Sequence, residues 1–431
     1  LDRAIQCEDC QYSHALILDG IKPKLRSTLL PYAFSAVSSE PSNEISSVTK
    51  FGGSAFIALS PATSIEAALI PDFSQVEADV AQVAINSPFA LFYPERRPFF
   101  IEGSDLLESR LKYVYTRTIS QPSALSKLNF QSKKLRFYAL TGYDPSSPYL
   151  VPGENYSAVG TTSGNWSTIL RAEHPMANAS SVGFMSTHRI YDQGGFGHTI
   201  ALDLNNQISP RWRYKIELAR TETQEPQSDW ITSGEKFSSY TSELDGERFS
   251  GYSLFSGIYR QSTNWKTRAD IMLLSPTFRP EMGFEPRNNR RRLEIGQQYR
   301  GFPNKKYIKN YSIYAETSLY TNYENVIKER STFTYTRMQL SGNINLSFNA
   351  KFIEKENYLN IDYENLFNGR LNISWSPNQA FSLGAGIGGG RQIAYNETNP
   401  RIGISQRRGV DLDLQAKGKF QWSLDLDYEE M

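Results

Sequence analysis

The chain of 431 residues has only two cysteines and four histidines, and it has no long apolar run. A transmembrane helix needs roughly 18 to 20 consecutive apolar residues, whereas the apolar runs here are as short as Ala55 to Leu59. If the chain spans a membrane, it must do so with strands closed into a barrel, because lipid cannot satisfy the open edges of a sheet. The net charge of +1 leaves no field to recruit nucleic acid, so no nucleic-acid partner is expected.

The two cysteines, Cys7 and Cys10, form a Cys-x-x-Cys pair without a second Cys or His pair to complete a metal site. A structural disulfide in an oxidising compartment is the favoured interpretation, and free thiols or redox or metal chemistry are the alternatives. His188 and His198 flank a predicted turn and could approach each other, but exposed or interface histidines are favoured over a metal site. Without a Gly-x-Ser-x-Gly elbow, a serine hydrolase has little support. We expect no cofactor, no metal and no catalytic residue.

Aromatic residues are abundant, with 25 Tyr and 24 Phe, yet the mean hydropathy is −0.48. Polar and apolar residues alternate with a period of two, and from Arg211 to Leu218 the aromatic and aliphatic side chains oppose charged ones. A soluble sandwich buries its apolar row against a second sheet, whereas a membrane barrel turns it to lipid and keeps the charges in a watery lumen. The predicted lumen charges are Arg211, Arg213, Lys215, Lys266, Arg268 and Asp270, with Glu217 beside them.

These patterns predict an all-β fold, an antiparallel transmembrane outer-membrane β-barrel of about 16 to 20 strands over residues 51–431. Residues 1–50 are expected to form a periplasmic lead-in and the first strand, and they can join an upstream domain. The longer connections at 144–164 and 221–248 are expected to be extracellular loops. The last strand-like stretch has no evident closing aromatic terminus, so closure is expected to need further residues.

Residues 70–107 interrupt the alternation with prolines and with charges among aromatic residues, which does not suit a lipid-facing strand. We therefore predict a plug-like segment inside the lumen or at the periplasmic mouth. Its motif residues are Asp72, Glu77, Asp79, Phe92, Pro94, Glu95, Arg96, Arg97, Phe99, Phe100 and Glu102. The first three acids could form an oxygen cluster for calcium, but hydrogen bonding or arginine pairing is favoured because their spacing matches no known calcium loop.

At these residues the chain resembles a large family of bacterial outer-membrane proteins. The family patterns are close to NPDFSQVEAD and FFPEKRPFFLEG, which stand here as Ile70 to Asp79 and Phe92 to Gly103. A second patch, Ser275 to Asn288, is similar to the family's SPDFRPELGFVPRND, and its motif residues are Phe278, Arg279, Glu281 and Arg287. The resemblance implies a barrel preceded by a module similar to the family-9 carbohydrate-binding fold. It implies location and architecture rather than an activity, although some members carry the label of membrane-associated hydrolase.

Two further patterns have a structural and a functional interpretation. Gly384 to Gly390 formally matches a dinucleotide-binding fingerprint, but it lies in a stretch with strand alternation, where the even-numbered glycines would leave room inside the wall. The run Arg287, Arg290, Arg291 and Arg292 could contact lipopolysaccharide phosphates, and lining the lumen or rim is the favoured alternative.

The leading hypothesis is a non-enzymatic channel in the outer membrane of a Gram-negative bacterium, with glycan-related solutes as candidates. A second hypothesis is a filled barrel that anchors a periplasmic module or partner protein, and a membrane-associated hydrolase is the third. The expected partners are outer-membrane lipid, lipopolysaccharide and an upstream carbohydrate-binding module or periplasmic protein.

Overall fold

The computed structural model describes residues 25–39, 45–71, 73, 86–231, 235–378, 380–396, 399–416 and 420–430. The first strands are β1 (Thr28–Ser39), β2 (Ile45–Ser60), β3 (Thr63–Leu69), β4 (Ala124–Gln131), β5 (Arg136–Asp144), β6 (Ser147–Val151), β7 (Ala158–Thr162) and β8 (Asn165–Met176). The central strands are β9 (Ser180–Tyr191), β10 (Phe196–Ser209), β11 (Trp212–Gln224), β12 (Lys236–Phe237), β13 (Tyr240–Thr241), β14 (Arg248–Gln261), β15 (Trp265–Leu274) and β16 (Arg290–Gly301). The last strands are β17 (Ile308–Thr321), β18 (Ile327–Leu340), β19 (Ile344–Tyr358), β20 (Ile361–Asn378), β21 (Phe381–Ile393), β22 (Ile402–Ala416) and β23 (Phe420–Glu430).

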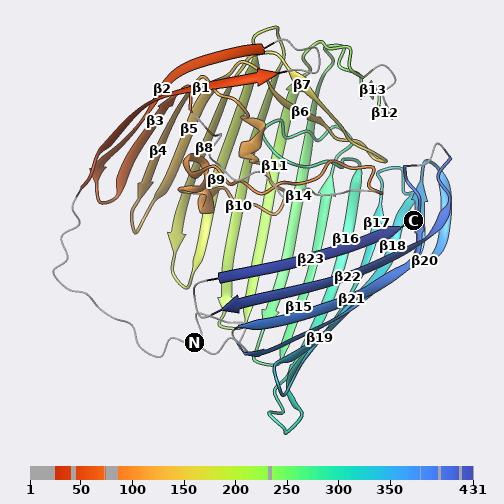
Figure 1. Ribbon diagram of the computed structural model, residues 1–431. Helices are drawn as coiled ribbons and strands as arrows, with labels where there is room; N and C mark the ends of the chain where they lie inside the picture. Colours follow the sequence, from red (N-terminus) through yellow and green to blue (C-terminus); the bar gives the residue numbers. More distant parts are fainter. Residues whose placement is uncertain are drawn as a thin grey trace.

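Nineteen strands form one antiparallel sheet, in which each strand pairs with the next along the chain. The sheet curls around an interior, with β1 and β23 as its two edges (Figure 1). The all-β prediction is confirmed, and the strand count falls within the expected range. No pairing joins β1 to β23 among the described residues. The pairs β6–β7 and β12–β13 form two separate two-stranded sheets.

Strand β11 illustrates how the alternation is used. Trp212 and Leu218 are 38% and 44% exposed on the outer face, whereas Glu217 between them is 8% exposed and faces inward. Successive side chains of a strand point to opposite faces, so one sequence supplies both an apolar outside and a charged inside. None of the helices in the described ranges has the length and apolar character of a membrane span.

Two segments fold into the interior of the curved sheet. The luminal segment, residues 86–121, carries helix α1 (Pro98–Ile101) and the 3-10 turns η2 (Ser104–Leu107) and η3 (Thr116–Thr118). Figure 1 shows it crossing the space inside the sheet. The inner loop, residues 275–289, connects β15 to β16 and packs beside it. The buried core lies between these segments and the wall, and it includes Phe100, Leu106, Ile119, Tyr138, Met185, Phe255, Phe278 and Met282.

Some element boundaries differ from the sequence expectation. The second strand, β2, already begins before residue 51, and the non-strand segment continues past residue 107 to Ser123. The connection at 144–164 holds the β6–β7 hairpin, and β11 extends to Gln224, inside the range expected to be a loop. The difference arises because a strand with mostly polar residues, such as Thr221 to Gln224, is still held by ladder hydrogen bonds to its neighbours.

Candidate functional site

The two family-like motifs, far apart in sequence, meet in the interior. The ring centroids of Phe92, Tyr115 and Phe284 lie 5.0 to 5.3 Å from one another. The Tyr115 backbone N–H donates to the Met282 carbonyl at 2.7 Å, and the Phe284 N–H donates to the Lys112 carbonyl at 2.9 Å. Tilted and edge-to-face aromatic contacts and paired backbone groups are both favourable. The luminal segment and the inner loop therefore form one packed unit.

The contacts of Arg97, which we call the arginine clasp, hold the start of the luminal segment in place. Arg97 donates from Nε and Nη2 to the two carboxylate oxygens of Glu95, at 2.8 and 2.7 Å. It also donates to the carbonyls of Ile119 and Thr116, at 2.6 and 3.0 Å, while the Thr116 hydroxyl donates to Glu95 at 2.6 Å. Burial alone would raise the pKa of Glu95, but the hydrogen bonds and charge of Arg97 outweigh burial and lower it. The bonds from Arg97 to Thr116 and Ile119 close the segment into a loop, and the bidentate pair with Glu95 orients the guanidinium.

Lys127, on β4, fastens α1 to the wall. Its ammonium group is fully buried and pairs with Glu66 at 2.8 Å, and it donates to the carbonyls of Phe99 and Glu102 at 2.6 and 3.3 Å. Every Lys127 donor hydrogen thus has an acceptor, as a buried ammonium group requires. Sequence analysis did not single out Lys127, although its place among apolar residues in β4 is a signal that it faces the interior.

A second buried network, at the end of the sheet that carries the β6–β7 hairpin, holds the inner loop. Arg279 is 2% exposed and donates to Glu225 at 2.6 Å and to the Tyr149 hydroxyl at 3.2 Å. The Tyr149 hydroxyl donates to Glu281 at 2.8 Å. Burial raises the pKa of Glu225 to about 7, despite the opposing charge of Arg279. From the wall, Arg189 donates to the Glu281 carbonyl at 3.3 Å, which joins strand and loop.

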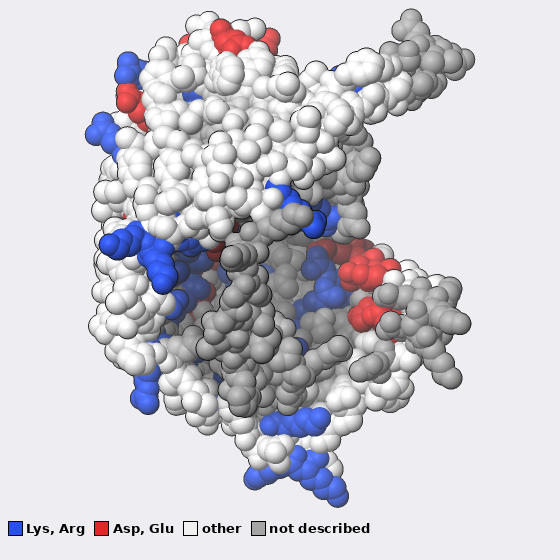
Figure 2. Space-filling view, turned by 90° about the vertical axis from the view of Figure 1, so that its left-hand side faces the viewer, with Lys and Arg blue, Asp and Glu red and all other residues white. Residues whose placement is uncertain are grey.

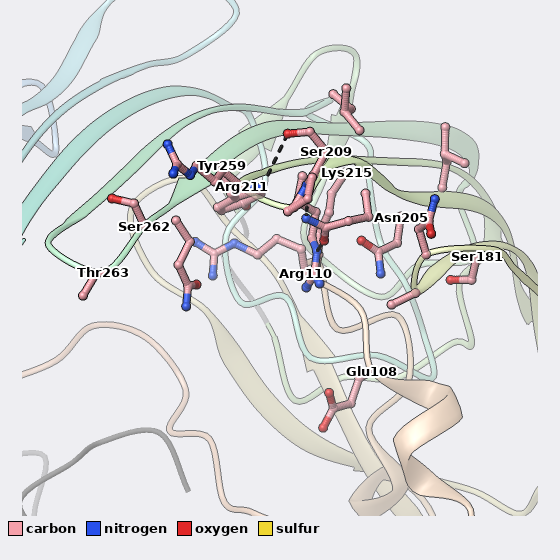
Figure 3. Close-up of a pocket in the computed structure, with 18 of the residues that line it drawn as sticks. Glu108, Arg110, Ser181, Asn205, Ser209, Arg211, Lys215, Tyr259, Ser262 and Thr263 are labelled. Carbon is pink, nitrogen blue, oxygen red and sulfur yellow. Dashed lines mark hydrogen bonds between the residues drawn. The ribbon is translucent and has the colours of Figure 1, made fainter. Parts of the chain in front are cut away.

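A cavity of about 1600 Å³ lies between the luminal segment and the wall, toward the short β10–β11 and β14–β15 turns. Figure 3 shows Arg110, Arg211 and Lys215 gathered around it, with Glu108 across the space. Most acids of its lining have partners: Asp203 pairs with Arg171, and the carboxylate of Glu217 accepts from the Arg110 backbone N–H at 2.9 Å, whereas Glu108 has no ion-pair partner among the described residues. The remaining basic side chains form no ion pair with any other described residue: Arg211, Arg213, Lys215, Arg300 and Arg337. Figure 2 shows basic side chains in the hollow of the sheet.

The predicted lumen charges differ in whether they form ion pairs. Arg211, Arg213 and Lys215 line the cavity. Arg268 is held in a network, with Nε 2.9 Å from Asp270 Oδ2 and a further ion pair to Glu294. Glu294 in turn lies 3.2 Å from Arg292 Nε. The charge of Arg268 is therefore balanced within the wall.

The other predicted residues have diverse positions. Phe99 and Phe100 pack edge to face at 5.3 Å, and Arg117 donates to the Pro94 carbonyl at 2.9 Å. In the basic run, Arg287 stacks 3.8 Å from the Phe89 ring centroid, Arg290 pairs with Glu285 at 3.2 Å, and Arg291 bonds the β17–β18 turn. Arg96, Glu102 and Phe278 lie in the two inner segments. Asp72, Glu77, Asp79, Cys7 and Cys10 lie outside the described residues.

The run from Gly384 to Gly390, here called the glycine stripe, is part of strand β21, and no helix follows it in the described chain up to residue 396. Leu383 and Ile387 are 39% and 60% exposed on the outer face, so Gly384 and Gly386 face inward. A second cavity of about 500 Å³ borders this face, lined by Arg370, Gly386, Asp411 and Asp427 among others. The stripe leaves room inside the wall instead of binding a dinucleotide phosphate.

Fold and site thus define an all-β protein whose antiparallel sheet curves around two inward-folded segments. Residues 23–136 match a protein family described as a domain of unknown function (DUF5916). This match covers less than half of the chain and includes the first family-like motif. A comparison with curated proteins finds no match. The crystal structure of Acinetobacter baumannii OccAB3 is similar with a TM-score of 0.35 and 8% identity, over 74% of this chain and 90% of that chain.

Proposed function

We propose that the protein is an outer-membrane β-barrel channel of a Gram-negative bacterium, which favours anionic solutes. An apolar outer face supports the membrane location: Ile200, Leu202 and Ile295 are 51 to 55% exposed, while their inward neighbours are polar or small. Trp212 and Trp265, at the beginnings of β11 and β15, are 38% and 43% exposed. Tryptophan at strand ends suits a membrane interface, where one edge of the ring meets water. The family-like motifs agree with this location.

The observation that carries the selectivity is the row of basic side chains without ion-pair partners in the larger cavity. Arg213 and Lys215 on β11 and Arg211 in the turn before it line the cavity, and Arg300 and Arg337 line it from β16 and β18. A pore lined by uncompensated charge of one sign concentrates counter-ions and repels ions of the same sign. Acidic sugars are one class of anion that would connect the channel to glycan-related solutes. An upstream carbohydrate-binding module and contacts with lipopolysaccharide would fit the same role.

The luminal segment supports a second candidate, a filled barrel that anchors an upstream or partner domain. Its clasp at Arg97, its tether to Lys127 and its contact with the inner loop occupy much of the interior. The hydrogen bonds from the buried Lys127 ammonium group to this segment must break before the segment can move, and each is worth about 1.5 to 3 kcal/mol. In the channel hypothesis the same segment narrows the pore.

The test is the current through the full chain in planar bilayers under a KCl gradient. We expect a reversal potential of the sign that marks anion preference, which should move toward cation preference when Arg211, Arg213 and Lys215 are all replaced by Glu. The matched control is Arg330→Gln, which alters an exposed ion pair with Glu354.

Arg97→Ala should raise the conductance because it opens the clasp. A chain and an Arg97→Ala variant that both insert into the bilayer without conducting would favour the anchor.

A further inference from the structure

A cluster of polar residues interrupts the apolar outer face of β9 and β10. Phe184 and Ile190 are 41% and 53% exposed on β9, whereas Met185 and Arg189 are buried against the interior. Ser186 and His188 share the even-numbered register of the exposed residues, so they also face outward. On β10, His198 is paired in register with His188. Three side chains that carry acid–base or nucleophilic chemistry therefore meet on the outer wall.

Their hydrogen bonds form a relay. The Ser186 Oγ lies 2.8 Å from His188 Nε2, and His188 Nδ1 lies 2.9 Å from His198 Nδ1. When the His188 Nδ1–H donates to the lone pair of His198 Nδ1, the His188 Nε2 is left to accept the proton of the Ser186 hydroxyl. This is the arrangement of a nucleophile, a base and a group that orients the base.

Two further side chains, Phe196 and Glu222, interact with His198. Phe196 stacks on the His198 ring, with centroids 4.7 Å apart and planes at 21°. The carboxylate of Glu222, the register partner of His198 on β11, interacts electrostatically with it. Glu222 also forms an ion pair with Arg248. Arg220 stands in the same row across the sheet as Ser186, because both are register partners of Ile200. Arg220 is therefore a cationic residue in the row of Ser186, two strands away from it.

We infer that this cluster is a second site, an ester hydrolase centre on the outer wall in which Ser186 is the nucleophile and His188 the general base. Ser186 Oγ attacks the carbonyl carbon of an ester and passes its proton to His188. The bond from that carbon to the alcohol oxygen breaks, and the alcohol leaves with the proton. Water then attacks the acyl-serine, His188 takes a proton from the water and returns it to Ser186 Oγ, and the carboxylic acid leaves. One ester and one water give one acid and one alcohol.

The position of the site points to a membrane lipid as the substrate, and this assignment rests on the proposed location in the outer membrane. His188 lies three residues before the end of β9, where Tyr191 packs against Tyr149 of the β6–β7 hairpin. The strand ends border the interface, and the ester bonds of phospholipids lie at the boundary between headgroups and acyl chains. Ser186 is 4% exposed and sits between its register neighbours Leu170 and Ile200. This placement favours an apolar chain over a water-soluble ester.

Sequence reasoning missed this site because the nucleophile lies on a strand rather than in an elbow turn. The spacing Ser-x-His places both side chains on one face of a strand, which is a weak signal on its own. The third residue is twelve positions after Ser186 and joins only through the pairing of β9 with β10.

The test uses the full chain in mixed micelles with a phospholipid that carries a fluorogenic acyl ester, together with a fluorophosphonate probe for the nucleophile. We expect hydrolysis and labelling at Ser186, and a loss of about a thousandfold in rate with Ser186→Ala or His188→Ala. The matched control is Ser250→Ala, an outward-facing serine on β14 that is the register partner of Glu222. His198→Gln should slow the reaction about a hundredfold and change the pH at which the rate rises, because His198 positions His188.

Unchanged conductance of the Ser186→Ala variant would show that the chain is folded and inserted, which separates this proposal from the proposed channel. Turnover and labelling that persist in Ser186→Ala, or a chain that conducts without either, would overturn the hydrolase site. A full chain that hydrolyses the ester but does not conduct would instead overturn only the proposed channel.

Discussion

The two walls of the interior differ in their inward-facing side chains and in what covers them. The wall from β4 to β16 presents large charged side chains, such as Lys127 and Arg189, which are buried against the inward-folded segments. The wall from β20 to β23 borders a cavity and lines it with glycine, short polar residues and charged residues such as Arg370 and Asp427. A polar group that is buried needs a hydrogen-bonding or charged partner, whereas one that borders a water-accessible cavity can be hydrated. The comparison teaches that the inner segments pack mainly on the first wall, the packed side, and reach the second, the bare wall, through Asn86, which bonds Ile393 and Tyr395 at the end of β21.

The largest expected effect comes from removing a buried charge on the packed side. Arg279→Ala leaves Glu225 buried without its cation, which should cost about 3 to 5 kcal/mol in the free energy of unfolding. Its counterpart on the bare side is Arg370→Ala, since Arg370 is 27% exposed and lies 3.5 Å from Asp427. That change should cost about 1 kcal/mol or less. Denaturant unfolding in detergent micelles compares the two, and equal losses would contradict the proposed asymmetry.

Within the bare wall, the glycines should differ in what they tolerate. A Cβ on Gly390 would lie 1.8 Å from the Phe367 carbonyl oxygen, which belongs to the backbone of β20. Gly390→Ala should therefore destabilise the chain by about 1 to 3 kcal/mol. A Cβ on Gly386 would meet the side chain of Asn372 at 2.5 Å, which can rotate away. Thermal unfolding should show little change for Gly386→Ala, and a similar loss in both variants would mean that the Asn372 side chain is as rigid as the backbone.

A smaller effect should appear as pH dependence on the packed side. Burial raises the pKa of Glu225 to about 7 in the folded chain, whereas a glutamate in an unfolded chain titrates near about 4.3. The folded state therefore binds the Glu225 proton more tightly than the unfolded state does. The resulting contribution to the free energy of unfolding is fully present below the unfolded pKa, and it is lost as the pH rises toward about 7. Glu225→Gln should remove that part of the pH dependence. Melting temperatures between pH 4 and 8 test this, and a variant that keeps the full dependence would assign it to another group.

The fold class follows from local patterns, whereas the site depends on distant contacts. Trp212, Glu217 and Leu218 reveal their faces within one strand, because the alternation of side chains is a property of the extended backbone. The prolines and charges of the luminal segment likewise predict that it leaves the sheet. The aromatic contact between Phe92 and Phe284 joins positions 192 residues apart, and nothing near either residue predicts the other.

The sequence by itself determined the all-β architecture, the approximate number of strands and the exclusion of the Pro- and Phe-rich segment from the wall. Tertiary structure decided which charges are balanced and which line the cavity, because ion pairs such as Arg268 with Glu294 form across neighbouring strands. It also decided that Ser186, His188 and His198 meet. Register is set by hydrogen bonds along a whole ladder and by packing on both faces, and a shift of one residue would turn every side chain to the opposite face.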